Sequence, residues 1–130
     1  MSSKITNSFL ILILALFFTF SSSIAETPQT VHLISKLDNG TNPVQIKCQV
    51  NGALSADLTL KSGQDFQFTT NVKGKYNCEA SWGRYIAAFD AFEPTRDKGH
   101  SIIYWWIKED GFYLSWNKID WKLIVEWESE

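Results

Sequence analysis

Residues 76–82 read Tyr-Asn-Cys-Glu-Ala-Ser-Trp, and the regular alternation of apolar and polar side chains in this stretch is the clearest structural signal of the chain. Because successive side chains of a β-strand point to opposite faces, the alternation predicts a strand with one face in a core and the other in water. Residues 44–50 and 56–60 repeat the same period of two. Residues 85–92 and 102–107 are largely apolar on both faces, which is typical of central strands that are covered on both sides.

Beyond its N-terminal segment, the chain is a succession of such strand-like runs, separated by turn-forming residues and without a helical pattern. All six Trp and all four Tyr lie in this part, and aromatic residues favour strands. Short strands with frequent turn signals are typical of β-sandwiches. The sequence therefore predicts an all-β fold: a single-domain antiparallel β-sandwich of about eight strands.

Three turns are expected to close β-hairpins. Residues 38–43 consist of residues that tolerate positive φ or preset a turn, so they predict a hairpin between the flanking strands. The turn at residues 61–65, which lies between two alternating runs, predicts another hairpin. Residues 110–111, Asp-Gly, are a two-residue hairpin signal that precedes the strand-like run 112–116.

The N-terminal segment predicts export. Residues 9–20 read FLILILALFFTF, an apolar run between a short basic segment and a series of small residues, which is the pattern of a secretory signal peptide. The run is too short for a membrane-spanning helix, which needs roughly 20 apolar residues. We expect cleavage between Ala25 and Glu26, so that residues 1–25 are the signal peptide. Residues 26–130 are then a secreted, extracellular domain without membrane insertion.

The charge balance is ordinary. The chain carries 12 basic and 14 acidic residues, a formal net charge of −2. Because charges of both signs are interspersed, neither a nucleic-acid groove nor a polybasic membrane patch is expected. We expect a monomer that binds no nucleic acid and no cofactor.

Cys48 and Cys78 are the only cysteines, and both fall on the apolar face of a predicted strand. In an exported chain this favours a disulfide between them. Two buried free thiols are the alternative. A metal site is less favoured because two cysteines without a nearby histidine do not complete a tetrahedral ligand set.

Asn39-Gly40-Thr41 is the one N-x-[ST] sequon of the chain. It lies at a predicted turn, where the glycosylation machinery of the secretory pathway can reach it. We therefore expect glycosylation at Asn39.

Catalysis has little support in the sequence. The two histidines, His32 in an amphipathic strand and His100 at a loop edge, have no recognisable catalytic partner. Asp90 and Glu93 are the carboxylates that a glycosidase could use, but a solvated strand end is the favoured interpretation. The sequence predicts no enzyme, no catalytic residue and no metal ligand.

The six Trp residues suggest either a core or a platform for stacking sugars. Trp82, Trp121 and Trp127 fall on the apolar face of alternating strands, which favours packing in the core. Trp105 and Trp106 are adjacent and must point to opposite faces of a strand, so one of them is expected near the surface.

Several short stretches together resemble a known family. They are Val31-His32-Leu33, the Cys48 strand, residues 60–68, Tyr76-Asn77-Cys78, Ser81-Trp82, residues 89–92, Arg96-Asp97, Trp105, residues 109–113 and Trp121. In this order and spacing they resemble the plant self-incompatibility proteins, or S-protein homologues. The resemblance implies a small secreted β-sandwich that acts as an extracellular ligand, because the founding members are stigma proteins recognised by incompatible pollen.

The chain departs from that family in its cysteines. Typical members carry four, and the second pair lies just before the Trp and Asp-Gly segment, where this chain has residues 99–104 without cysteine. The loss of both members of one pair implies that Cys48 and Cys78 are the pair that remains.

Three functional hypotheses remain open. The favoured one is a secreted, non-enzymatic signalling or recognition protein with a cell-surface receptor as its partner. The second is a carbohydrate- or lipid-binding module of the cell wall, which an exposed coplanar Trp pair would favour. The third is a small secreted hydrolase or toxin, which converging carboxylates, or His100 beside a carboxylate in a cleft, would favour.

The longest expected loop, residues 93–100, is the candidate surface for a partner. It carries mixed charge and no large apolar side chain apart from Pro94. Binding residues on β-sandwiches usually lie in loops, so Arg96, Lys98 and His100 are the candidate partner-binding residues. A solvated connection, and for Arg96 an internal salt bridge to Asp97 or Asp90, are the alternatives.

Overall fold

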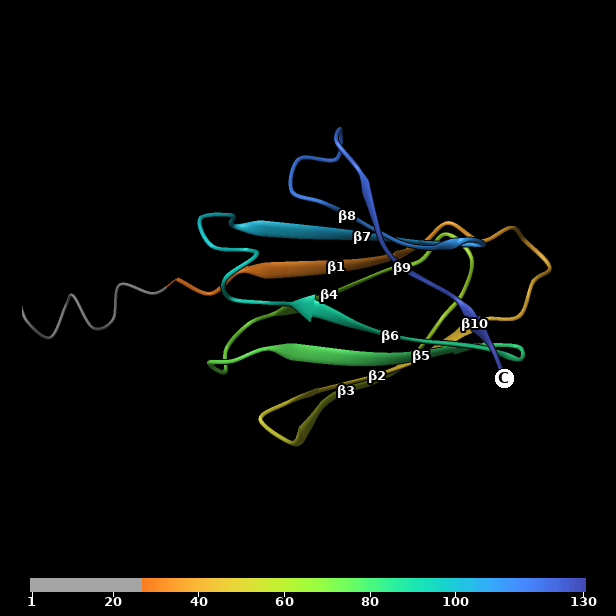
Figure 1. The fold of residues 1–130 in the computed structure, drawn as a ribbon, viewed down its shortest axis with the longest axis horizontal. Coiled ribbons are helices and arrows are strands. Elements are labelled where there is room, and N and C mark those ends of the chain that lie inside the picture. The colour runs from red at the N-terminus through yellow and green to blue at the C-terminus, as the bar shows by residue number, and fades with distance from the viewer. Residues whose placement is uncertain (1–26) are drawn as a thin grey trace, which may run out of the picture.

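The computed structural model describes residues 27–130, so the predicted signal peptide and its cleavage between Ala25 and Glu26 lie outside the described residues. Ten strands form two sheets of five (Figure 1). The strands are β1 (Thr30–Ser35), β2 (Val44–Val50), β3 (Ala53–Leu60), β4 (Asp65–Thr69), β5 (Tyr76–Trp82), β6 (Tyr85–Phe92), β7 (Ile102–Lys108), β8 (Gly111–Ser115), β9 (Lys122–Glu126) and β10 (Glu128–Ser129).

The two sheets confirm the all-β sandwich. Strand order is β4-β1-β7-β8-β9 in the first sheet and β10-β6-β5-β2-β3 in the second. All pairs are antiparallel except β1 and β7, which run parallel. The largely apolar β7 is the central strand of its sheet, as predicted. The prediction that residues 85–92 and 102–107 are covered on both sides is wrong, because the outward residues of β7 are only half-buried and Tyr85 and Ile86 of β6 are exposed. The count of ten rather than about eight reflects short elements such as the two-residue β10.

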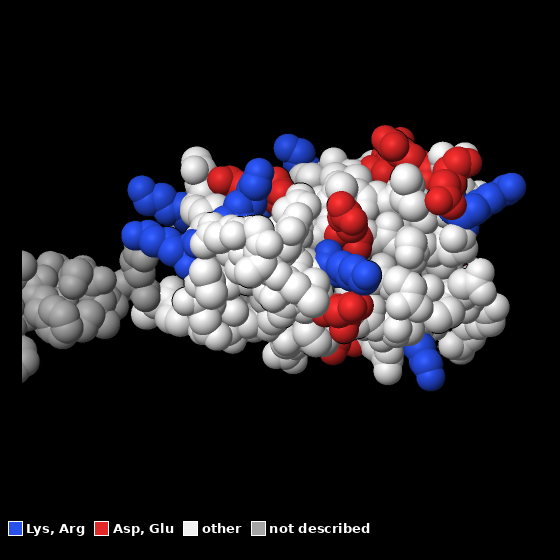
Figure 2. Space-filling model, turned by 90° about the horizontal axis from the view of Figure 1, so that it is seen from below, with Lys and Arg blue, Asp and Glu red and all other residues white. Residues whose placement is uncertain are grey.

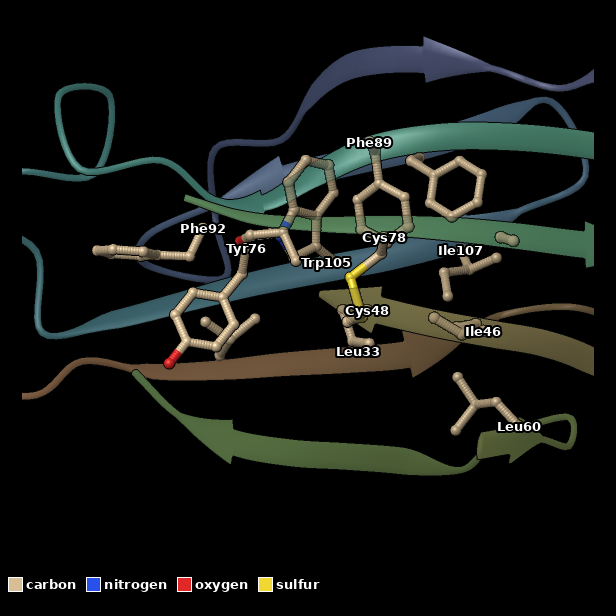
Figure 3. Packing of buried hydrophobic residues seen from close by; sticks show 14 of the residues in the cluster. Leu33, Ile46, Cys48, Leu60, Tyr76, Cys78, Phe89, Phe92, Trp105 and Ile107 are labelled. Carbon is tan, nitrogen blue, oxygen red and sulfur yellow. Dashed lines mark hydrogen bonds between the residues drawn. A yellow bond between two sulfur atoms is a disulfide. The ribbon is translucent and has the colours of Figure 1, made fainter. Parts of the chain in front are cut away.

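The hydrophobic core lies between the sheets and is built from the inward side chains of alternating strands. β2 alternates buried and exposed residues along its whole length. Trp105 is fully buried, its ring packs edge-on against Phe89 at 5.0 Å, and its indole nitrogen donates to the Ala91 carbonyl at 2.9 Å. Cys48 and Cys78 face each other across β2 and β5 and form the predicted disulfide inside this core (Figure 3).

Two of the three hairpin predictions are wrong. β1 and β2, which flank residues 38–43, lie in different sheets, and so do β3 and β4, which flank residues 61–65. Turn-forming residues show where the chain reverses, but they do not say whether it returns to the same sheet or crosses to the other. The hairpin at residues 110–111 is confirmed, and Asn51-Gly52, with φ of 53° and 80°, closes a further one between β2 and β3.

A β-bulge changes the environment of Trp121. Phe112 pairs with Val125, but the next residue of β8, Tyr113, pairs with Leu123, so β9 contains one extra residue. Such a bulge reverses the alternation of faces. Val125 therefore packs against the core, whereas Trp121 lies against Trp106, whose β7 neighbours Trp105 and Ile107 point into the core. The prediction that Trp121 packs in the core is wrong; the prediction that one of Trp105 and Trp106 lies near the surface is confirmed.

Candidate functional site

The loop between β6 and β7 is organised around the carboxylate of Asp97, which is fully buried. Its Oδ1 accepts hydrogen bonds from Arg96 Nε at 3.0 Å and from the indole nitrogen of Trp116 at 3.0 Å. Its Oδ2 accepts from Arg96 Nη2 at 2.7 Å and from the backbone nitrogen of Glu93 at 2.9 Å. A buried carboxylate is tolerated when its charge is paired and its lone pairs are satisfied, and four donors meet both conditions here.

Further hydrogen bonds hold the loop backbone. Asp97 donates through its backbone nitrogen to the Glu93 carbonyl at 2.9 Å, and its own carbonyl accepts from the backbone nitrogen of His100 at 3.1 Å. The Glu93 carboxylate accepts from the backbone nitrogens of Thr95 and Arg96 at 3.2 Å and 2.6 Å. The loop is thus held internally at both its start and its end.

The three candidate partner-binding residues have different environments. Arg96 forms the internal salt bridge to Asp97, and its guanidinium carbon lies 5.3 Å from the centre of the Trp105 ring. The His100 ring stacks on Trp116 with 4.2 Å between ring centres and an interplanar angle of 5°. Lys98 is exposed. For Arg96 the alternative of a salt bridge to Asp97 is confirmed, and the binding of a partner by all three residues stays a prediction.

Lys98 and His100 line a groove of about 600 Å³ at one end of the sandwich, together with residues 27–29 and the β4–β5 loop that contains Lys73. In Figure 1 the β4–β5 and β6–β7 loops lie at the end where the described chain begins, whereas the segment between β1 and β2 lies at the opposite end. Figure 2 shows Lys and Arg side chains at that first end, with Asp or Glu side chains close by. Lys73 and Lys98 line the groove itself.

The other ionisable candidates have structural partners. His32 Nδ1 lies 3.0 Å from an Asp65 carboxylate oxygen. Asp90 accepts from the Asn77 side-chain amide at 2.9 Å and lies 3.8 Å from the Lys75 ammonium. Within residues 27–130, no group of three or more His, Cys, Asp or Glu side chains could hold a metal ion, and no helix is long and apolar enough to cross a membrane.

Asn39 is exposed in the turn between β1 and β2, which makes the sequon accessible. The Thr41 hydroxyl donates to the Asp38 carbonyl at 2.8 Å. Glycosylation of Asn39 stays a prediction.

The residue that organises the loop was missed by sequence reasoning, which considered Asp97 only as a salt-bridge partner of Arg96. Its donors come from its own loop and from Trp116, which is 19 residues away in the sequence. No local pattern indicates such a contact. The one indication of these contacts in the sequence is the Arg96-Asp97 dipeptide, and this dipeptide is also compatible with a solvated ion pair.

The sequence profile of the plant self-incompatibility protein S1 family matches residues 30–127. The chain belongs to this family. The matched region runs from β1 to Trp127 and so includes the disulfide, the Asp97 loop and both sheets. The predicted resemblance to the self-incompatibility proteins is confirmed. No curated protein matches the chain.

The chain is also similar to a solved structure of SPH (Self-Incompatibility Protein Homologue) proteins. These are described as a widespread family of small, highly stable, secreted proteins from plants. The alignment has a TM-score of 0.57 and 14% identity, and it covers 78% of this chain and 97% of that chain. At this identity the likeness supports the sandwich fold. The prediction of a secreted protein agrees with what is known of the family that the profile assigns.

Proposed function

We propose that this S1-family protein is a secreted, non-enzymatic extracellular ligand, with its mature chain beginning at Glu26, and that a cell-surface receptor protein recognises its β6–β7 loop. The observation that carries the proposal is the anchoring of this loop by the buried Asp97 carboxylate, next to the exposed Lys98. A loop that is ordered before binding loses less conformational entropy when the complex forms. Rigid scaffolds commonly present their binding residues in this way.

The chemistry of the loop end favours a partner with acidic side chains. Lys98 supplies an exposed ammonium group, and His100 lies beside it along the groove, which the β4–β5 loop borders on the other side. Charged groups around a binding site increase association rates and favour partners of opposite charge. The expected receptor surface is therefore acidic.

The contacts of the described residues support a hydrolase less than they support a ligand. Asp90 and Glu93 hold neighbouring side-chain and backbone groups. The His100 ring is stacked on Trp116. These are the residues that would have favoured catalysis, and each has a structural contact instead.

The test measures saturable binding of the labelled secreted protein to intact plant protoplasts. Lys98→Glu reverses one exposed charge at the loop end, and Lys61→Glu makes the same change in the exposed turn between β3 and β4. We expect Lys98→Glu to weaken binding roughly tenfold, mainly through slower association, while Lys61→Glu binds as the wild type does. Equal binding of both variants contradicts recognition by this loop.

Treatment of the protoplasts with a protease distinguishes a protein receptor from other components of the cell surface. We expect brief proteolysis of the protoplast surface to abolish saturable binding. Binding that survives this treatment contradicts a protein receptor. Mature protein whose N-terminal sequence begins upstream of residue 20 contradicts the proposed processing.

A further inference from the structure

The outer face of the first sheet carries aromatic rings that the core does not use. Tyr104 and Trp106 are the outward, half-buried residues of β7 and alternate with the fully buried residues of that strand. Trp121, which the β9 bulge places outside the core, stacks on Trp106 with 3.6 Å between ring centres and an interplanar angle of 13°. Stacking on Trp106 covers one face of the Trp121 ring, and the other face has no ring contact among residues 27–130.

Three lysines surround these rings. The Lys36 Nζ atom lies 5.2 Å from the centre of the Trp106 ring, and Lys118 Nζ lies 4.9 Å from the centre of the Tyr104 ring. Lys108 Nζ lies 5.9 Å from the Trp106 ring centre. Within residues 27–130, none of these three ammonium groups forms an ion pair with a carboxylate. We call Tyr104, Trp106, Tyr113, Trp121, Lys36, Lys108 and Lys118 the aromatic–lysine face.

Three of the carboxylates near this face have partners of their own. Asp65 pairs with His32, Asp110 accepts from the Tyr113 hydroxyl, and Asp120 accepts from the Asn117 amide. The hydrogen bond to Asp110, together with the nearby charges of Asp110 and Glu126, raises the pKa of the Tyr113 phenol. None of these carboxylates pairs with the three lysines, so the three ammonium groups can pair with carboxylates of a ligand.

We propose that the aromatic–lysine face binds an acidic polysaccharide, in which sugar rings carry carboxylate groups. The C–H groups of a sugar ring carry partial positive charge and pack on the negative face of an indole, here the face of Trp121 that does not stack on Trp106. The ammonium groups around the stack then pair with carboxylates of the same polymer. A neutral sugar offers the lysines no carboxylate, whereas a uronate polymer offers both a flat sugar ring to the indole and carboxylates to the ammonium groups. Anionic lipid, whose interface also attracts Trp and Lys side chains, is the competing target in the test.

This face is separate from the β6–β7 loop, and the proposal does not depend on a receptor. The test measures binding of the secreted protein to polygalacturonate and to the same polymer with its carboxylates methyl-esterified, by affinity electrophoresis and tryptophan fluorescence. We expect binding to the acidic polymer with a change in Trp emission, weakening as salt is raised, and at least tenfold weaker binding to the ester. Equal binding to both polymers, or no binding to the acidic one, overturns the proposal.

Two variants locate the site. Lys36→Ala combined with Lys108→Ala removes two charges from the face, and Lys47→Ala combined with Lys61→Ala removes the same charge elsewhere. We expect the first pair to bind roughly tenfold more weakly and the second pair to bind nearly as the wild type does, because only the first loses contacts to carboxylates. Equal effects of the two pairs overturn the assignment of the surface.

The contribution of the ring is tested at Trp121, with folding checked by far-UV circular dichroism. We expect Trp121→Ala to weaken binding at least fivefold, while Trp121→Phe, which keeps an aromatic face, retains more of the affinity. Unchanged affinity in folded Trp121→Ala contradicts stacking on this ring. Vesicles with anionic phospholipid are the competing target, and binding to them that matches the affinity for polygalacturonate overturns the polysaccharide as partner.

Discussion

Replacing Asp97 by Ala should destabilise the protein far more than its place in a charged surface loop suggests. The change removes a fully buried carboxylate and leaves Arg96, the Trp116 indole and the Glu93 backbone nitrogen without their acceptor. Breaking a buried ion pair by removing one partner costs about 3–5 kcal/mol. Arg96 retains 22% side-chain exposure and can regain some water, which favours the lower end of this range.

We therefore expect Asp97→Ala to lower the free energy of unfolding by about 3 kcal/mol, a large part of the roughly 5–15 kcal/mol of a typical domain. For a domain of this size, that loss corresponds to a melting temperature lower by roughly 12 °C or more. The assay is urea unfolding of the secreted protein with its disulfide intact, followed by tryptophan fluorescence. Lys98→Ala, one residue away and exposed, is the matched control and should change stability by less than about 0.5 kcal/mol.

A double-mutant cycle tests the physical reason. Arg96→Ala leaves the Asp97 carboxylate buried without its cation, so it should cost nearly as much as Asp97→Ala. The double variant should then cost clearly less than the sum of the two single changes, because the pair acts as a unit. An Asp97→Ala variant within about 1 kcal/mol of the wild type, or strictly additive costs, would refute the view that this buried pair holds the loop.

Three further predictions concern other parts of the sandwich. Reducing the Cys48–Cys78 disulfide, which closes a loop with a sequence separation of 30, should lower the unfolding free energy by about 3–4 kcal/mol in urea titrations with and without reductant; overlapping titrations would contradict this. Gly111→Ala should cost about 2 kcal/mol or more in the same assay, because φ is 150° and a Cβ would clash with the backbone oxygen of Val125 in β9, whereas Gly63→Ala, with open space around the Cβ, should cost less. Protein secreted by plant cells should lose mass on treatment with peptide N-glycosidase, and Asn39→Gln should not; an identical mass before and after treatment of the wild type contradicts glycosylation.

Much of the fold could be predicted because it depends on local alternation. The period of two in residues 44–50 and 76–82 identifies β2 and β5 and their buried faces, and the same alternation places both cysteines inside the core. The adjacency of Trp105 and Trp106 requires one ring to point outward, as it does. These inferences need only the geometry of a single strand.

The wrong predictions concern segments whose structure depends on contacts with residues far away in the sequence. The turns at residues 38–43 and 61–65 look like hairpin turns, yet each leads the chain from one sheet to the other. The extra residue in β9 moves Trp121 to the outer face, and only the pairing with β8 reveals it. The surroundings of Asp97 depend on Trp116, whose position follows from the assembled sheets.

The contacts of Asp97 also explain how the β6–β7 loop is held without a disulfide of its own. Residues 99–104 contain no cysteine, so the order of this loop comes from hydrogen bonds and from the His100–Trp116 stack. The disulfide joins the neighbouring strands β2 and β5 of the second sheet and includes no residue of the loop. Reduction should therefore lower global stability while leaving backbone amides of the loop protected from hydrogen exchange in the native state. Asp97→Ala should do the opposite at the loop, speeding exchange there while the disulfide stays closed, because the two constraints act on different parts of the sandwich.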